Sequence, residues 1–363
     1  RGFIMKKRAV YSIIIIMLVF TSCTIGGSFY MLNFSLTPNA KILSKDADSY
    51  PYMYRNYPFL RPWVDSLKQV NALKDTFIIN PQGIQLHAFY IAAPAPTSKT
   101  AVIVHGYTDN AIRMFMIGYL YNRDLRYNIL LPDVQHQGES EGRAIQMGWK
   151  DRIDVLQWMN IANEIFGDST QMVVHGISMG GATTMMVSGE KQKPFVKCFV
   201  EDCGYTSVWD EFSHELKSSF HLPAFPLMYT TSWLCEKKYG WNFKEASSLK
   251  QVEKCETKIH MSPHGWFIRF MKQSRNPKNS GSYREQPMPS RTKRINRNTP
   301  TKYGISSGGI FIKTIMKSIL TLILATFLLI PLQAQEKVYT VDNLPKVHLQ
   351  NKMHYVCNPA GIL

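Results

Sequence analysis

The sequence has no pair of cysteines at the C-x-x-C spacing and no cluster of cysteine with histidine at the spacing of metal ligands. Structural zinc sites and disulfide-rich domains both need such clusters. We therefore expect no metal site and no disulfide framework, and since no other cofactor motif is present, no cofactor. The cysteines are scattered through the chain, at Cys23, Cys198, Cys203, Cys235, Cys255 and Cys357.

Acidic residues are scarce, with 26 Asp+Glu against 42 Lys+Arg and a net charge of +16. A basic chain often binds nucleic acid or anionic membranes. Most of the excess is local, however, because segment 256–315 has 12 basic and 2 acidic residues, which leaves +6 for the other residues. We therefore expect no nucleic-acid partner. With 45% hydrophobic residues among 363, the chain can bury one large core or two ordinary ones.

No charged residue occurs between Arg8 and Lys41, and Lys6 and Lys7 precede this apolar run. A basic flank followed by such a run is typical of an export signal or a membrane anchor, which we assign to residues 1–40. With the positive end inside, the rest of the chain lies on the outer, periplasmic or extracellular, side. Three forms stay open: an uncleaved anchor, lipid modification at Cys23, and an ordinary cleaved signal.

From residue 75 onward, short apolar runs alternate with helical patterns. We expect strands at 76–79, 84–92, 101–104, 128–131, 172–174 and 195–200, and helices at 111–121, 151–165 and 181–188. Strands separated by helices of this length predict a mostly parallel sheet with helices on both faces. In such sheets, the functional residues lie at the carboxyl ends of the strands.

The segment Gly176-Ile177-Ser178-Met179-Gly180 follows one of these strands and opens the next helix. This is a G-x-S-x-G pattern in the strand, turn and helix context that a nucleophile elbow requires. The glycines Gly176 and Gly180 permit a sharp turn that lifts the Ser178 hydroxyl clear of the backbone. The pattern therefore predicts a nucleophilic serine at Ser178.

An acyl-transfer nucleophile also needs hydrogen-bond donors for the oxyanion that develops on the carbonyl oxygen. We expect these donors to be the backbone N–H groups of Met179, at the start of a helix, and Tyr107, at the end of an earlier strand. The imidazoles of His105 and His175 fit structural hydrogen-bonding roles better than a role as the base.

Region 75–255 resembles the α/β-hydrolase superfamily, and within it the bacterial membrane-anchored hydrolases of the serine aminopeptidase and acyl-esterase type. The motifs that carry this resemblance are His105-Gly106-Tyr107-Thr108-Asp109, Asp133 with His136, Gly138, Glu139 and Ser140, Gly148-Trp149-Lys150-Asp151, the turn at Ser178, and Glu201-Asp202-Cys203-Gly204-Tyr205.

The resemblance implies an α/β-hydrolase domain over residues 41–255. It also implies a cap-like segment at 212–243 that shapes substrate choice, and hydrolysis of a small ester or peptide-like substrate through an acyl-enzyme. The 133–140 stretch departs from the family pattern, because Gln137 stands between His136 and Gly138. We expect that stretch to be a structural loop.

Such a hydrolase needs an acid and a histidine from later strands. Segment 256–315 contains no Leu, Val, Ala or Asp, so no strand or amphipathic helix can be read from it. We expect the sheet to end after its sixth strand and this basic tail to be unstructured, with an RNA-binding extension as the alternative. Asp202 is a weak alternative acid. The histidines that could approach Ser178 are His214, His221, His260 and His264.

A shift of reading frame explains the tail. Codons rebuilt one step out of register can encode an acid across Lys258 and Ile259, a histidine across Pro287 and Met288, and a final amphipathic helix. We infer a small deletion and a frameshift near Cys255, which leave a serine hydrolase impaired by loss of its acid and histidine. The alternative is a non-catalytic, membrane-tethered binding protein with a basic tail.

Residues 316–363 contain a second signal-like segment. A methionine and a lysine precede an apolar run over 319–332, which ends in a small-residue cleavage pattern. The residues after it resemble the start of secreted bacterial TPM-domain proteins. We therefore expect a second coding sequence to begin at Met316, and a second transmembrane helix is the alternative.

Overall fold

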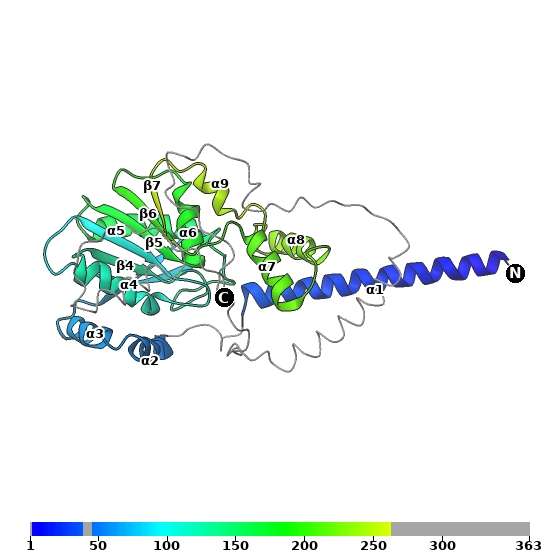
Figure 1. Cartoon of the computed structure of the whole chain (residues 1–363), viewed down its shortest axis with the longest axis horizontal. Helices are drawn as coiled ribbons and strands as arrows, with labels where there is room; N and C mark the ends of the chain where they lie inside the picture. Colours follow the sequence, from blue (N-terminus) through cyan, green and yellow to red (C-terminus); the bar gives the residue numbers. More distant parts are fainter. Residues whose placement is uncertain (1, 39–45, 263–363) are drawn as a thin grey trace, which may run out of the picture. The chain divides into compact units, whose positions relative to one another are not determined.

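The computed structural model describes residues 2–38 and 46–262 (Figure 1). The sequence predictions for segments 263–315 and 316–363, including the altered frame and the second signal, lie outside these residues. The described residues belong to one compact unit. Before the sheet begins, the chain forms three helices, α1 (Gly2–Leu36), α2 (Asp46–Asn56) and α3 (Leu60–Gln69).

Within residues 74–262, seven strands form one sheet in the order β1-β2-β4-β3-β5-β6-β7. The pairs β1–β2 and β2–β4 are antiparallel and the remaining pairs are parallel. The strands are β1 (Lys74–Ile79), β2 (Gln85–Ile91), β3 (Lys99–Val104), β4 (Asn128–Pro132), β5 (Gln171–Ile177), β6 (Val196–Asp202) and β7 (Lys258–Ser262). The predicted mostly parallel sheet is confirmed.

The helices that follow the strands cover both faces of the sheet, as predicted. Along the chain, the helices after β3 are η1 (Ala111–Met114), α4 (Phe115–Tyr119), η2 (Leu120–Asp124), α5 (Asp151–Ile165), α6 (Met179–Ser188), α7 (Val208–Phe220), α8 (Leu227–Tyr239) and α9 (Ser248–Val252). Of these, α7 and α8 lie away from the sheet, next to α1 (Figure 1). Figure 1 shows α4 on one side of the sheet and α5 with α6 on the other.

Successive side chains along a strand point to opposite faces of the sheet, and this explains why helices cover both faces. On β4, Leu130 belongs to the core cluster that includes Trp158 of α5 and Met186 of α6. Its neighbours Ile129 and Leu131 point the other way, toward Gly118 of α4. All three β4 side chains are fully buried. A parallel strand that is apolar on both faces can only be stable with helices on both sides.

The last two turns of α1 pack on the folded domain. Ser28, Leu32 and Leu36 recur every fourth residue, so they form one stripe, and all three are fully buried. The Leu36 carbonyl accepts a hydrogen bond from the Ile145 N–H at 2.8 Å. The part of α1 from Ala9 to Leu36 is long and apolar enough to cross a membrane.

The prediction that the sheet ends after its sixth strand was wrong. Residues 258–262 form β7, which pairs in parallel with β6 and sets Ile259 opposite Phe199. Ile259 is half-buried and packs against Met185 and Val252. The exposed N–H and C=O groups of β6 provide a template for pairing, so a short segment of weak strand propensity adds to the sheet. The predicted unstructured tail therefore cannot begin at residue 256.

Candidate active site

Ser178 lies at the bend between β5 and α6, and its backbone has φ 56° and ψ −120°. A non-glycine residue with positive φ is strained, and such strain is typical of a nucleophile elbow. The bend is held from the neighbouring strand, because the Ser178 N–H donates to the Asp202 carbonyl at 2.8 Å. The side chain of Ser178 is exposed. The strained turn therefore presents a hydroxyl to solvent at the carboxyl end of β5.

The two glycines of the pattern are required by close backbone packing. A Cβ at Gly176 would lie 1.9 Å from the Gly180 carbonyl oxygen, and a Cβ at Gly180 would lie 2.2 Å from the Val104 carbonyl oxygen. Neither position can hold a side chain, because the bend folds back on itself and against the end of β3. These close contacts explain why both positions require glycine, as the sequence predicted.

The β3–η1 turn lies directly beside Ser178. A Cβ at Gly106 would be 3.5 Å from Ser178 Cβ, so Gly106 and the adjacent Tyr107 approach the nucleophile position. Met179 is buried and is the first residue of α6. The two backbone segments that we expect to supply oxyanion donors therefore flank the same hydroxyl.

Tyr107 also links this turn to the N-terminal helix. Its phenol donates a hydrogen bond to the Ser35 carbonyl of α1 at 2.8 Å. Burial raises the pKa of the phenol to about 12, so it stays protonated and keeps this bond at neutral pH. No sequence pattern indicated that the end of α1 reaches the turn beside Ser178.

His105 and His175 have the structural roles that the sequence analysis assigned. In fully buried His105, Nδ1 bonds to the Gly106 carbonyl at 2.8 Å, and Nε2 accepts from the Val134 N–H at 3.0 Å. These two bonds define a neutral imidazole with its proton on Nδ1. His175 is buried and bonds through Nδ1 to the Tyr121 phenol at 3.2 Å.

No described residue hydrogen-bonds the Ser178 hydroxyl as a base. His214 is exposed on α7, and His221 caps the end of α7, where its ring contacts the Lys217 carbonyl. His260 lies in β7 and His264 is outside the described residues. Asp202 is buried at the end of β6, opposite Ile177 in register, and its backbone carbonyl accepts the hydrogen bond from the Ser178 N–H.

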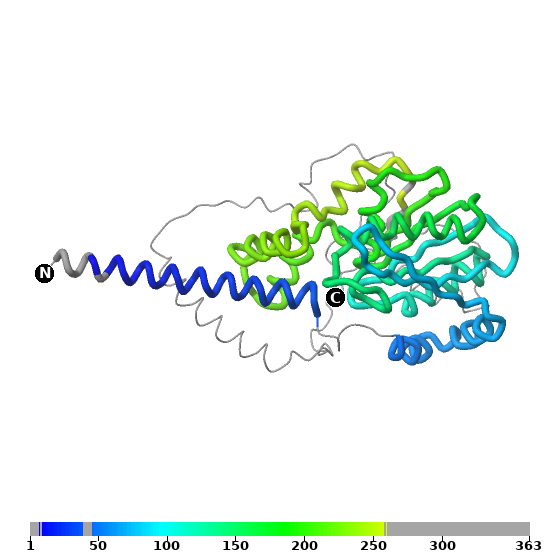
Figure 2. Tube along the Cα trace, turned by 180° about the vertical axis from the view of Figure 1, so that it is seen from behind, coloured from blue at the N-terminus to red at the C-terminus, as the bar shows by residue number. Residues whose placement is uncertain are grey.

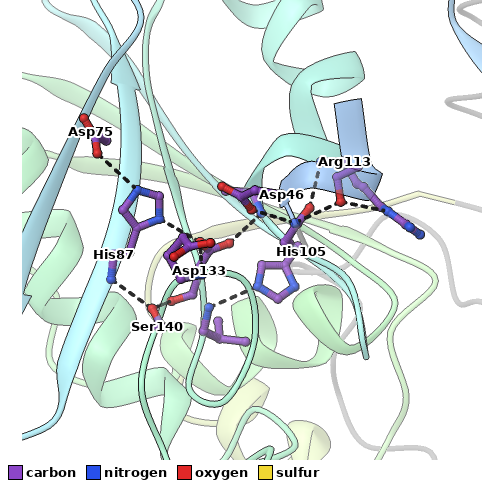
Figure 3. Close-up of polar contacts among 12 residues, drawn as sticks. Asp46, Asp75, His87, His105, Arg113, Asp133 and Ser140 are labelled. Carbon is purple, nitrogen blue, oxygen red and sulfur yellow. Dashed lines mark hydrogen bonds and ion pairs between the residues drawn. The ribbon is translucent and has the colours of Figure 1, made fainter. Parts of the chain in front are cut away.

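A buried Asp–His pair at the end of β4 was missed by sequence reasoning (Figure 3). The Asp133 carboxylate accepts from His87 Nδ1 at 2.7 Å, from the Ala111 N–H at 2.7 Å and from the Glu139 N–H at 3.1 Å. Ser140 completes the cluster: its hydroxyl donates to the Asp133 carbonyl and accepts from the His87 N–H. Stretch 133–140 is therefore a structural loop, as predicted, but one tied to β2.

Electrostatics explain how this pair stays stable inside the protein. Burial alone would lower the pKa of His87, but the hydrogen bond and charge of Asp133 outweigh it and raise that pKa. Nearby Asp46 accepts from the Asn110 amide at 3.0 Å. Burial, and then the charges of Asp133 and Glu139, raise the pKa of Asp46 to about 6. The antiparallel register of β2 with β4 sets His87 next to Asp133, and only the folded sheet reveals this register.

The pKa of Glu201, which lies opposite Gly176 in the sheet register, is raised as well. Glu201, which precedes Asp202 on β6, is fully buried and accepts a hydrogen bond from the Gly204 N–H. Burial raises its pKa to about 7.

Within residues 2–38 and 46–262, no group of three His, Cys, Asp or Glu side chains could hold a metal ion.

Comparison with known proteins gives matches over part of the chain. Residues 139–266 match the prolyl oligopeptidase family. The uncharacterized protein YqkD of Bacillus subtilis (strain 168) is 24% identical over 187 residues, which are 51% of this chain and 61% of YqkD. The chain therefore spans about three fifths of the length of this relative.

Two solved esterases show weaker likeness. Pf2001 of Pyrococcus furiosus is 19% identical with a TM-score of 0.41, covering 54% of this chain and 71% of that one. Acetyl xylan esterase 1 of Thermoanaerobacterium sp. is 16% identical with a TM-score of 0.37, covering 52% and 67%. A likeness at these values says nothing about a substrate.

The class of the protein follows from the sheet order and from the strained serine turn after β5. The chain has an α/β-hydrolase-type fold. Residues 139–266, which match the prolyl oligopeptidase family, contain the turn, the helices α7 and α8, and β7.

Proposed function

We propose that this chain is a serine hydrolase that acts on carboxylic esters or amides through an acyl-enzyme on Ser178. The observation that carries the proposal is the backbone of Ser178, a non-glycine residue held at positive φ with an exposed hydroxyl. A strained conformation persists only where the surrounding structure enforces it, and at a strand-to-helix bend its use is to present a nucleophile. The match to a family named for an oligopeptidase supports the amide or ester substrate.

The reaction has two steps. The Ser178 oxygen attacks the substrate carbonyl while its proton passes to a base, and the leaving alcohol or amine departs with a proton. Water then attacks the acyl-enzyme, releases the acid and restores the hydroxyl. In each step the carbonyl oxygen becomes an oxyanion, which the N–H groups of Tyr107 and Met179 are placed to stabilise. Such donors are typically worth about 10²–10³ in rate each.

The rate of this chain is expected to be low. The acid of an α/β hydrolase comes after the strand that follows β6, which here is β7, ending at Ser262. Residues 263–284 contain neither Asp nor Glu. Asp202, at the end of β6, is the remaining candidate for the acid. Because no base bonds to the Ser178 hydroxyl among the described residues, we expect the nucleophile and its oxyanion donors to support only slow turnover.

A fluorophosphonate probe tests this proposal on the full chain. We expect slow labelling over hours that disappears in Ser178→Ala and persists in Ser218→Ala, an exposed serine on α7. Label that remains in Ser178→Ala would show that the nucleophile is wrong. Labelling within seconds would show that the catalytic groups are present, and Asp202→Asn would then identify whether that carboxylate is one of them.

We also propose that α1 anchors the chain in a membrane with the hydrolase domain on the outer side. The apolar length of α1 supports a span, and the basic residues before it favour an inside N-terminus. The buried stripe does not separate an uncleaved helix from a cleaved one, because Leu32 and Leu36 follow Cys23 and stay with the domain whether or not the chain is cut before Cys23.

A further inference from the structure

The N-terminal helix is longer than a bilayer requires. A hydrocarbon core of roughly 30 Å is crossed by about 20 residues. Counted from Ala9, directly after the basic cluster, twenty residues end at Ser28. Ser28 is fully buried, and its hydroxyl donates to the Leu227 carbonyl of α8 at 3.5 Å. The first turn of α8 therefore lies at the depth where the hydrocarbon ends.

The helix α8 runs beside α1 in the same direction (Figures 1 and 2). Its start contacts Ser28, and near its end Lys238 Nζ donates to Asn33 Oδ1 at 3.3 Å. Because Ser28 precedes Asn33 along α1, the N-terminal end of α8 points toward the bilayer. The apolar surface of α1 continues alongside, with Phe29 46% exposed and Phe34 50% exposed.

Three aromatic side chains form an exposed stripe on this membrane-facing element. Phe225, Tyr229 and Trp233 are 70%, 47% and 53% exposed. Tyr229 and Trp233 are four residues apart and so lie on one side of α8. Phe225 precedes the helix, and its ring centre lies 6.0 Å from that of Tyr229. Large exposed aromatics are unusual on a surface that faces water, whereas Tyr and Trp are enriched at membrane interfaces. Lys244 Nζ lies 4.8 Å from the Tyr229 ring centre, so a cation borders the stripe, as anionic headgroups require.

The turn beside Ser178 lies farther from the hydrocarbon than the start of α8, near the outer edge of the headgroups. Tyr107 is bonded to the carbonyl of Ser35, which is seven residues beyond Ser28, or about 10 Å along a helix. The headgroup layer on each side of a bilayer is roughly 5–8 Å thick. The adjacent Gly106 packs against Ser178. The nucleophile is therefore within reach of the outer edge of the headgroups.

We propose that the aromatic stripe Phe225, Tyr229 and Trp233 inserts into the bilayer interface and that the site receives the acyl ester of a membrane lipid. The substrate part of this inference rests on the proposed serine hydrolase function. The ester carbonyls of membrane lipids lie between the hydrocarbon and the headgroups. The site mouth, about 10 Å beyond the hydrocarbon, reaches such a bond when the lipid rises by about that distance, while the rest of the apolar chain stays in the bilayer.

Photo-cross-linking in vesicles of phosphatidylcholine and phosphatidylglycerol tests the contact. The full chain carries Tyr229→p-benzoylphenylalanine or, as the control, Phe77→p-benzoylphenylalanine. Both native side chains are 47% exposed, but Phe77 lies on β1 at the edge of the sheet. We expect about tenfold more lipid adduct at 229 than at 77, because only position 229 lies at an interfacial depth. Equal yields, or adducts of 229 with a second copy of the chain, would overturn the inference.

A second experiment separates this inference from the proposed function. A phosphatidylcholine with a diazirine beside its ester carbonyl is irradiated with the Ser178→Ala chain, which needs no chemistry to bind lipid. We expect labelled peptides that contain Tyr107 or residue 178, and a lipid with its diazirine at the acyl end should label α1 instead. Absence of label near Tyr107 would overturn the lipid-substrate inference. Failure of fluorophosphonate labelling in the unaltered chain would overturn the nucleophile and leave the lipid contact standing.

Discussion

At the scale of single residues, burial of carboxyl groups decides how stability depends on pH. Asp151, the first residue of α5, is fully buried, and its carboxylate accepts from the Gly148 N–H at 2.9 Å. Burial, and then the charge of Asp154, raise the pKa of Asp151 to about 7. The folded protein therefore keeps a proton that the unfolded chain releases near pH 4.

The sign of the effect follows from proton binding. Between about pH 4 and pH 7 the folded state binds more protons at Asp151 than the unfolded state, so stability falls as pH rises through this window. Urea denaturation measures how far the free energy of unfolding declines between pH 5 and pH 8. We expect this decline to be smaller in Asp151→Asn than in the unaltered chain. The exposed Asp65→Asn should leave the decline unchanged. An equal decline in both variants would contradict this assignment.

A second prediction concerns Gly138, at φ +56° in the loop after β4. A Cβ there would lie 2.1 Å from the Asp133 carboxyl carbon, inside the cluster that holds His87. We expect Gly138→Ala to cost about 3 kcal/mol or more, because it strains the backbone and displaces a buried carboxylate. Gly167→Ala is the control, since Gly167 also has positive φ but no atom within 4 Å of its Cβ position.

That control should cost only about 1 kcal/mol, the strain of a side chain at positive φ. Urea denaturation of both variants gives the comparison. Similar losses of unfolding free energy in the two variants would mean that the Asp133 carboxylate shifts at little cost to make room for a Cβ. The cluster would then contribute little to the rigidity of the structure around β4. The difference between them therefore measures how firmly Asp133 is held.

At the scale of elements, β7 shows how a strand can form without a sequence signal. Ile259 supplies the side chain of β7 that packs on α6 and α9, against Met185 and Val252. We expect Ile259→Ala to reduce the free energy of unfolding by about 1–2 kcal/mol, since a half-buried isoleucine loses part of its apolar contact. Leu249→Ala, 46% exposed on α9, should stay within about 0.5 kcal/mol. A neutral Ile259→Ala would show that β7 does not pair stably.

The helix α1 shows the opposite case. Its apolar length was evident from the sequence, but that length alone could not show that its final two turns belong to the folded domain. The stripe of Ser28, Leu32 and Leu36 lies inside a run that is apolar all round, so its periodicity is hidden. The contact between Ser35 and Tyr107 depends on two segments 72 residues apart, and only the fold brings them together.

At the scale of the whole molecule, the frameshift proposal ties the missing catalytic groups to the composition of segment 256–315. Beyond β7, the remainder of this segment, which has no Leu, Val, Ala or Asp, lacks the residues that usually build the core of an α/β hydrolase. We expect the nucleotide sequence around the Cys255 codon to encode, one step out of register, an acid loop, a histidine loop and a final helix. An intact frame supported by independent reads would make the basic tail genuine and end this proposal.

Several features were determined by the sequence alone. Strand and helix periods fixed the sheet class, and the G-x-S-x-G pattern located the strained turn at Ser178, because both depend on neighbours in the chain. The predicted structural roles of His105 and the loop after Asp133 also held, since residues at strand ends tend to bond nearby backbone.

Tertiary structure alone decided the rest. The Asp133–His87 pair forms across two strands, β7 forms on the open edge of β6, and the end of α1 packs beside the turn at Ser178. Each of these contacts joins segments that are distant in the chain, and each is driven by burial or by unpaired backbone groups that exist only once the sheet has formed. A local sequence pattern depends only on neighbouring residues, so it cannot indicate partners from distant segments.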